Sequence, residues 1–379
     1  MRAWNGLVVW WVVLVGCGAP DEGESPHSRT AALHSSSRPS SPTSVQVMTR
    51  NLYVGADVGR LFSVSSLDQI PGVVSGIYQT IQDTRFSERA EALADEVARS
   101  QPALIGLQEV ALLRRQSPGD FFRGNPVPAT TVVQDNLQLL LSALAARGLI
   151  YVPVIVQENT DIELPSMNGD DLRLTDRDVI LARSDVDVEA TRGHHYATNR
   201  VINLGGLSFA IQRGWVEADV HFESGMMHFA NTHLEPASTP ALQVVQEAQA
   251  SELILAMLAK HGPVSLVGDF NSAPGEGTYQ LLASSGFADL WTLANDGAPG
   301  LTCCQAEGLR NVPSRLVERV DLLLLRGPMG HLGPWFREPY AADVVGDELG
   351  DRTPSGLWPS DHGGVAGGFR VSTGASGEM

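Results

Sequence analysis

The sequence predicts an α/β fold built on a mixed sheet or two packed sheets. Groups of consecutive strand-like segments alternate with single helix-like segments, whereas a doubly wound sheet would alternate one strand with one helix. The chain has 379 residues and is 43% hydrophobic, which is enough apolar material for a large core. We expect the folded domain to span residues 44–372, followed by a flexible Gly- and Ser-rich tail at 373–379.

The first expected strand covers residues 45–52, which begin with alternating β-branched residues and carry Asn51 near the end. A segment with several glycines and a proline follows, and it is expected to be a loop. Ser87 then opens a helix, because apolar residues recur at helical spacing on one of its faces. Pro102 lies just beyond the end of this helix, where the chain turns into the next strand.

Residues 103–110 form an apolar run that is expected to be a strand delivering Glu109 near its far end. A second amphipathic helix is expected at 131–147, closed by Gly148. Pro240 lies in the first turn of a longer helix that should run to Lys260. Further strands are expected at 151–157, 178–183, 207–211, 214–222, 226–233, 319–325 and 368–371.

The segment that starts at Val264 is a short apolar run bounded by Gly-Pro before it and Pro-Gly after it. This pattern predicts a buried strand that ends in a tight turn. Asp269 and Asn271 are two residues apart, so their side chains would leave an extended chain on the same face. A polar reaction centre and a simple Asx turn explain this pair equally well when it is considered alone.

Polar residues that apolar packing does not require recur at the ends of the expected strands. They are Asn51, Glu109, His233, Asp269, Asn271, Asp321, Asp361 and His362. Each has an ordinary structural explanation by itself, such as a turn cap or a hydrogen-bonded core histidine. Together they supply carboxylates for a hard cation, imidazoles for proton transfer and amides for binding an anion. The set therefore predicts one catalytic centre at the strand ends.

The order of four motifs resembles that of the endonuclease/exonuclease/phosphatase superfamily, over roughly residues 45–371. Gly-Asp-Phe-Asn at 268–271 and Ser-Asp-His-Gly at 360–363 are specific in combination, and Leu-Gln-Glu-Val at 107–110 and Asn-Thr-His-Leu at 231–234 support them. The resemblance implies a four-layer α/β/β/α sandwich, in which two mixed β-sheets are flanked by helices. It also implies hydrolysis of a phosphoester.

The resemblance further implies a metal site. Glu109 and Asn51 would hold Mg²⁺, or Mn²⁺ in its place, and Asp361 would support the metal or its waters. Some members of this superfamily carry an acidic residue two positions after the first-strand asparagine, and here that residue is Tyr53. This departure puts a two-metal scheme that uses that acid in doubt.

The same resemblance implies the catalytic roles. His362 would be the general base that activates water, and Asp321 would orient its ring. Asp269 would position the attacking water or a proton near the leaving group, and Asn271 would hydrogen-bond the phosphoryl oxygens. His233 would contact the phosphate or assist the leaving group.

The first residues indicate an export signal. Arg2 is the only early charge, and the apolar run at 7–15 is too short for a comfortable membrane span. Leu14-Val15-Gly16-Cys17 resembles the lipobox of bacterial lipoproteins, in which the cysteine is lipidated and becomes the new N-terminus. Residues 1–17 would then be the lipoprotein signal, and 18–43, rich in Ser and Pro, a flexible tether. An ordinary cleaved signal, and a secreted protein, is the alternative.

Two adjacent cysteines follow Cys17, at Cys303 and Cys304. They form either a vicinal disulfide or two buried thiols, and this fold is not built on disulfides. The formal net charge of −17 disfavours broad non-specific binding to nucleic acid, because an acidic chain gains little from counterion release. It still permits a polyanionic substrate at one local site where a metal supplies positive charge.

Two functions from different classes remain open. The first is metal-dependent hydrolysis of a phosphoester by a monomer, acting as a phosphodiesterase, a nuclease or a phospholipase C-like enzyme. The second is a membrane-tethered binding lipoprotein that kept an inactive fold of this superfamily. The aromatic segment at 333–336 with Tyr340 is either a membrane-contacting loop or part of the core.

Overall fold

The computed structural model describes residues 43–372. The expected signal at 1–17 with Cys17, the tether at 18–43 apart from its last residue, and the tail at 373–379 lie outside the described residues. Within residues 43–372, no helix is both long enough and apolar enough to cross a membrane.

Two large mixed sheets form the centre of the fold. The first contains β1 (Thr43–Asn51), β2 (Leu104–Gln108), β3 (Leu112–Gln116), β4 (Thr131–Asp135), β5 (Tyr151–Pro165), β6 (Asp171–Arg183), β15 (Phe336–Val345) and β16 (Gly364–Val371). Its strand order is β15-β16-β1-β2-β6-β3-β4, with β5 paired to β6.

The second sheet contains β7 (Asp187–His195), β10 (Gly214–Phe222), β11 (Gly225–His233), β12 (Val264–Asp269), β13 (Ala288–Asp289) and β14 (Asp321–Arg326). Its order is β13-β14-β12-β11-β10-β7. A separate hairpin joins β8 (Arg200–Leu204) to β9 (Leu207–Ile211).

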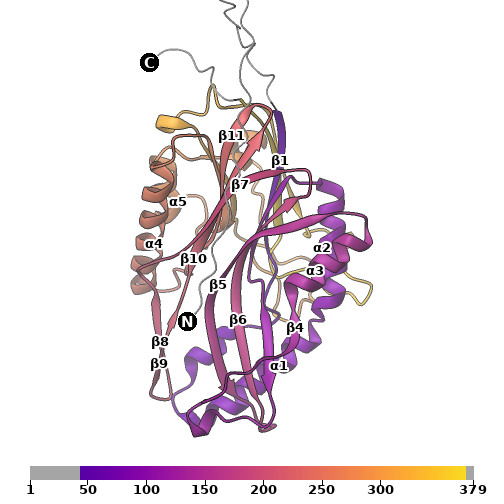
Figure 1. Ribbon diagram of the computed structural model, residues 1–379, viewed down its shortest axis with the longest axis vertical. Coiled ribbons are helices and arrows are strands. Elements are labelled where there is room, and N and C mark those ends of the chain that lie inside the picture. The colour runs from indigo at the N-terminus through magenta and orange to yellow at the C-terminus, as the bar shows by residue number, and fades with distance from the viewer. Residues whose placement is uncertain (1–42, 373–379) are drawn as a thin grey trace, which may run out of the picture. The chain divides into compact units, whose positions relative to one another are not determined.

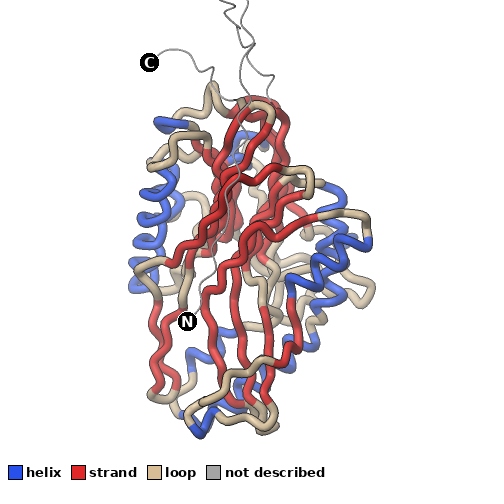
Figure 2. Tube along the Cα trace, in the orientation of Figure 1, coloured by secondary structure: helices blue, strands red, loops and turns tan. Residues whose placement is uncertain are grey.

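The helices are α1 (Ile70–Asp83), α2 (Phe86–Ser100), α3 (Asn136–Ala146), α4 (Pro240–Leu258), α5 (Gly277–Ser284) and α6 (Leu290–Ala294). Short 3-10 turns lie at Val58–Ser63, Leu67–Gln69, Phe121–Arg123, Pro328–Gly330 and Leu349–Asp351. Helices α2 and α3 lie on one side of the strands, and α4 and α5 on the other (Figures 1 and 2).

Three apolar clusters explain this layering. Buried side chains such as Phe229, Val267 and Phe369 fill the space between the two sheets. The outer face of the first sheet packs against α2 and α3, and that of the second sheet packs against α4 and α5. Each sheet is therefore buried on both faces, which explains why its central strands are continuous apolar runs. The predicted fold, two mixed β-sheets flanked by helices, is confirmed.

The topology brings particular strand ends to one edge of the sandwich. Strands β1 and β2 run parallel in the first sheet, as do β11 and β12 in the second, so each pair ends on one side. Strand β14 runs antiparallel to β12 and starts opposite its end, where Asp321 faces Asp269. Strand β16 likewise runs antiparallel to β1. The polar residues that follow or precede these strands therefore meet at one edge.

Gly268 allows β12 to approach β11 closely. Its φ is +150°, and a Cβ atom there would lie 2.1 Å from the carbonyl oxygen of Thr232. Any larger residue would push the two parallel strands apart and displace Asp269, which follows directly. The glycine of the Gly-Asp-Phe-Asn motif is therefore a structural requirement for placing the aspartate.

Two sequence expectations about helices are wrong. The helix expected at 131–147 begins only at Asn136, because the β-branched Thr-Val-Val segment before it forms β4. Asp135 caps the helix, its carboxylate accepting a hydrogen bond from the amide of Leu137 at 3.1 Å. The expected loop after β1 contains α1, since its proline lies in the first turn, where no amide hydrogen is needed.

Candidate active site

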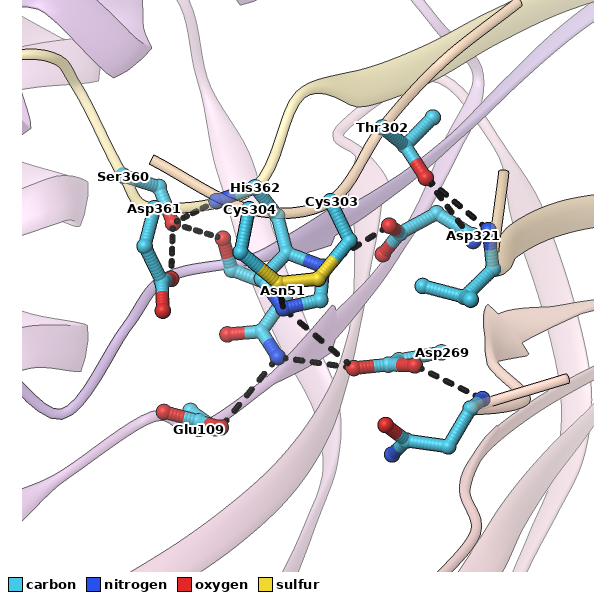
Figure 3. The surroundings of a disulfide bond; sticks show 12 residues. Asn51, Glu109, Asp269, Thr302, Cys303, Cys304, Asp321, Ser360, Asp361 and His362 are labelled. Carbon is cyan, nitrogen blue, oxygen red and sulfur yellow. Dashed lines mark hydrogen bonds and ion pairs between the residues drawn. A yellow bond between two sulfur atoms is a disulfide. The ribbon is translucent and has the colours of Figure 1, made fainter. Parts of the chain in front are cut away.

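The centre of the site is a buried His–Asp pair. His362 Nδ1 lies 2.8 Å from Asp321 Oδ2, and the two residues are 6% and 0% exposed. Asp321 is the first residue of β14, and His362 lies in the loop just before β16 (Figure 3). Burial disfavours the charged ring, but the carboxylates of Asp321, Asp269 and Asp361 outweigh it and raise the pKa of His362 well above its usual value.

Asp269 connects this pair to the rest of the site. Its Oδ2 accepts a hydrogen bond from the Asn51 amide at 3.1 Å and lies 3.5 Å from His233 Nε2 and 3.8 Å from His362 Nε2. Burial raises the pKa of Asp269 to about 7, with His362 opposing the shift and Asp321 adding to it. One carboxylate therefore faces two imidazoles, an arrangement suited to holding or passing a proton.

The pairing of Asp269 with Asn271 combines both explanations that the sequence left open. Asp269 Oδ1 accepts a hydrogen bond from the Asn271 backbone amide at 2.9 Å, which is the Asx turn. The other oxygen of the same carboxylate faces the site. The Asn271 side-chain amide donates to the Leu234 carbonyl at 2.9 Å, so this residue joins the end of β12 to the end of β11.

His233 contacts an arginine that sequence reasoning missed. Arg213 donates to His233 Nδ1 at 2.6 Å, and its guanidinium also lies 3.7 Å from carboxylates of Asp176 and Glu235. Burial, with the positive charges of Arg213 and His362, lowers the pKa of His233 well below its usual value. Arginine only donates, so Nδ1 accepts and the neutral ring carries its proton on Nε2, toward Asp269.

Glu109 and Asp361 form the acidic side of the site. Glu109 follows β2 with a left-handed φ of 54°, and its Oε2 accepts from the Val54 amide at 2.8 Å. Burial raises the pKa of Asp361 to about 6; the charge of His362 opposes this shift and the Glu109 carboxylate adds to it. A bound divalent cation would relieve this destabilisation of the charged Asp361 carboxylate.

The donor set fits a hard cation. Glu109 and Asp361 line one cavity, and Asp269, Asp321 and His362 offer ligand atoms within 4.8 Å of one another beside it; oxygen ligands suit Mg²⁺ or Mn²⁺. Asn51, the other expected ligand, lies between Glu109 and Asp269. Its amide nitrogen bridges Glu109 Oε1 at 3.3 Å and Asp269 Oδ2 at 3.1 Å, while its oxygen accepts from the Tyr53 amide at 2.9 Å.

The adjacent cysteines form a disulfide beside the histidine. Cys303 and Cys304 are bonded to each other, and Cys304 Sγ lies 3.8 Å from His362 Nε2 (Figure 3). The backbone of Cys303 also forms isolated antiparallel β-bridges with Glu318 and with His362. The vicinal disulfide, one of the two states that the sequence allowed, therefore packs against the centre of the site.

The aromatic segment after β14 belongs to the core. Phe336 is 2% exposed and stacks edge-on against Phe369 at 5.1 Å between ring centroids. Trp335 and Tyr340 are partly buried against the same inter-sheet cluster. Of the two alternatives, the structure favours core packing over a membrane-contacting loop.

The structure thus brings together most of the polar residues expected from sequence. Asn51, Glu109, His233, Asp269, Asp321, Asp361 and His362 meet at one edge, and Asn271 braces that edge from the side. Sequence reasoning missed Arg213 and Asp176. The sequence held two indications of them: Arg213 is a charged residue just before β10, and Asp176 and Asp178 alternate along β6. A buried His–Asp pair, a second imidazole, an arginine and paired carboxylates can bind an anion and remove a proton beside it.

A comparison with models of protein families identifies the family to which the chain belongs. The model described as the Endonuclease/Exonuclease/phosphatase family matches residues 79–362. The chain belongs to this family, whose description names enzymes that hydrolyse phosphoester bonds. The search of curated proteins found no match.

Solved structures share the fold at low sequence identity. An endonuclease/exonuclease/phosphatase family protein from Bacteroides thetaiotaomicron matches with a TM-score of 0.53 and 14% identity, covering 90% of this chain and 99% of that one. A protein of the same description from Beutenbergia cavernae matches at 0.52 and 19%, covering 87% and 72%. A humanized D. rerio TDP2 matches at 0.51 and 16%, covering 86% and 98%.

Proposed function

We propose that this protein is a metal-dependent phosphoester hydrolase in which His362 activates water. The observation that carries the proposal is the buried His362–Asp321 pair at 2.8 Å, placed beside Asp269 within a family of phosphoesterases. A domain that only binds would gain nothing from burying a base together with its orienting acid and a third carboxylate.

His362 has the geometry of a general base. Asp321 accepts a hydrogen bond from Nδ1, and Nε2 is the nitrogen that would take the proton once a bound cation, by its positive charge, lowers the raised pKa of the ring. Asp269 Oδ2 lies 3.8 Å from Nε2 and would hold the attacking water against it. As the ring becomes positive, the carboxylates of Asp321 and Asp269 stabilise it, and so the proton transfer is favoured.

Glu109, Asn51 and Asp361 would hold the cation, and the amide nitrogen of Asn51 would keep Glu109 and Asp269 in place. A bound Mg²⁺ or Mn²⁺ supplies positive charge to the phosphoryl oxygens and allows the two carboxylates to remain ionised together. Tyr53, at the position of the missing acid, donates its hydroxyl to the Glu307 carbonyl at 3.1 Å and so adds no carboxylate.

Arg213 and His233 would bind the phosphoryl group. Arg213 lines the same cavity as Glu109 and Asp361 and is a donor-only cation. The neutral His233 ring, protonated on Nε2, can donate to a phosphoryl oxygen or to the leaving group. Asn271 braces these groups from the ends of β11 and β12.

A substrate panel tests the proposal. We expect purified protein with Mg²⁺ or Mn²⁺ to cleave at least one of bis-p-nitrophenyl phosphate, plasmid DNA, RNA, sphingomyelin and inositol phosphates. EDTA should lower that rate about 10²-fold or more, because it removes the main charge stabilising the phosphoryl oxygens. Glu109→Gln should weaken metal binding while leaving the melting temperature of the chelated protein nearly unchanged.

Undiminished turnover in EDTA would remove the metal from the mechanism. A metal-loaded protein that cleaves no member of the panel, and that binds one of them instead, would favour the alternative of a membrane-tethered binding lipoprotein.

A further inference from the structure

The cavity that contains Glu109, Asp361 and Arg213 extends well beyond the candidate active site. It has a volume of about 480 Å³, and Glu109, Asp361 and Arg213 form part of its lining. Most of the remaining wall is aliphatic. These side chains also pack into two apolar clusters, and the space left between the clusters is bounded mainly by aliphatic groups, which suits an apolar occupant.

Along strand β6 the lining of the cavity changes from polar to apolar. Leu172, Leu174 and Asp176 lie two residues apart on one face of the strand, and all three line the cavity. From Asp176, beside Arg213, to Leu172 the strand covers about 13 Å at 3.3 Å per residue. Strand β5 repeats the pattern, since Ile162 and Leu164 pair with Leu174 and Leu172.

The opposite wall of the cavity is also apolar. Helix α1 contributes Val74, Ile77 and Ile81, which lie on one face at helical spacing. The β8–β9 hairpin contributes Ile202 and Ile211. Strands β5 and β6, helix α1 and the β8–β9 hairpin therefore all contribute aliphatic side chains to one cavity whose polar end is the candidate active site.

We propose that the substrate is a phosphoester of a long hydrocarbon chain, with the phosphate at the catalytic end and the chain along this apolar cavity. The inference rests on the proposed function and names its substrate class. A hydrocarbon chain needs no hydrogen bonds and gains free energy from aliphatic contact.

Other phosphoesters fit this wall less well. Hydroxyl groups of a sugar or inositol phosphate would find partners among the polar side chains of the lining, but none along Leu172, Leu174 and Ile162. A nucleobase is bound by aromatic stacking and edge hydrogen bonds, and the net charge of −17 opposes a nucleic-acid backbone. Of the cavity's aromatic side chains, Phe62 is already covered by the Arg200 guanidinium, 4.0 Å from its ring centroid.

The reaction balances as an ordinary hydrolysis. The oxygen of water forms a bond to phosphorus, the proton goes to His362, and the bond between phosphorus and the leaving oxygen breaks. The leaving oxygen then takes a proton, so the products are an alcohol and a phosphate ester with one fewer substituent. No oxidant or other co-reactant is needed.

A chain-length series tests the substrate class. In p-nitrophenyl alkyl phosphodiesters with ethyl, butyl, octyl and dodecyl chains, the leaving group stays constant while the chain grows. We expect kcat/KM to rise with chain length by as much as about fourfold per methylene, from the 0.8 kcal/mol that burial of one methylene contributes, until the cavity is filled. Equal kcat/KM for ethyl and dodecyl esters, each below its micelle concentration, would refute the proposal.

Two neighbouring residues of β8 provide a matched pair of variants. Ile202 is 5% exposed and lines the cavity, whereas Val201 is 61% exposed on the other face of the same strand. Ile202→Trp should fill the cavity and lower kcat/KM for the dodecyl ester more than tenfold, with the ethyl ester changed less than about twofold. Val201→Trp should leave both unchanged. Ile211→Trp, at a half-buried position, repeats the test if Ile202→Trp does not fold.

Direct binding separates failure of this proposal from failure of the catalytic one. Dodecylphosphonate should bind the metal-loaded protein at least tenfold more tightly than ethylphosphonate in calorimetry, and Ile202→Trp should abolish the difference. If the ethyl ester is hydrolysed but chain length has no effect on rate or binding, the apolar cavity is not a substrate site and the hydrolase stands. If no ester is hydrolysed while the phosphonate preference appears, the cavity binds lipid phosphates without catalysis.

Discussion

Individual site residues adopt backbone conformations that side-chain-bearing residues seldom use. Tyr53, Glu109 and Asn271 have left-handed φ values of 59°, 54° and 47°, and each follows the end of β1, β2 or β12. Such conformations cost free energy and persist where the surrounding contacts enforce them. At these three positions the chain turns sharply, which places the side chain at the strand end instead of on a sheet face.

The buried charges of the site make a prediction about pH and stability in the absence of metal. Asp269, with a pKa of about 7, and Asp361, at about 6, bind protons more readily when folded than when unfolded. The pKa of His362 is also raised in the folded state. The folded state therefore binds more protons, and in EDTA the melting temperature should rise as pH falls from 8 to 6.5.

Below pH 6.5 the trend should weaken, because the lowered pKa of His233 means that the unfolded chain binds a proton that the folded chain does not.

Asp361→Asn should raise the free energy of unfolding in EDTA at pH 8 by about 1–2 kcal/mol, since it removes a charge that burial destabilises. Asp185→Asn, at an exposed carboxylate paired with Arg183, is the control and should not stabilise the protein. A melting temperature in EDTA that falls from pH 8 to 6.5 would contradict these charge assignments.

At the scale of elements, apolar runs predicted the central strands well because these strands are buried on both faces. The expected strands at 207–211 and 214–222 match β9 and β10 residue for residue. The helices of the first half were harder to predict. Helix α1 has Pro71 and Gly72, which normally indicate a loop, in its first turn, and it is held by burial of Ile70, Val74 and Ile81. Local sequence could not reveal that tertiary packing.

The sequence indicated the site residues carried by specific motifs but not those that depend on pairing between strands. Asp269 and His362 stand in motifs whose order could be read directly. Arg213 reaches His233 only because β10 pairs with β11, and Asp176 reaches Arg213 only because β6 of the first sheet lies against β10 of the second. Neither pairing follows from local sequence, so these two residues required the structure.

At the scale of the whole molecule, the candidate active site depends on two sheets that are assembled from distant parts of the chain. Asn51 and Glu109 come from the first sheet, whereas His233, Asp269 and Asp321 come from the second. The inter-sheet core therefore sets the distances within the site. Any change that shifts one sheet against the other should alter the site without touching a catalytic residue.

The cellular location of the protein is also a question for the whole chain. We propose that the protein is exported and anchored to a membrane of the cell envelope through lipid on Cys17, which lies outside the described residues. In the producing cell, Cys17→Ser should release the protein from the membrane fraction while kcat in the soluble fraction stays unchanged, because the site lies within residues 51–362. A wild-type protein found soluble, with a mature N-terminus beyond Cys17, would show that the anchor is absent.

The most direct test of the central claim is the kcat of His362→Ala on whichever phosphoester the wild type cleaves. A general base contributes about 10²–10⁴-fold, so we expect kcat to fall by at least about 10²-fold with little change in KM. Asp321→Asn should lower kcat in the same direction by a smaller factor. His228→Ala is the matched control, because His228 is also buried and hydrogen-bonded to an aspartate, Asp219 at 2.6 Å, on the second sheet. Loss of kcat in His362→Ala with kcat retained in His228→Ala is the predicted result, and a folded His362→Ala protein with wild-type kcat would contradict the mechanism.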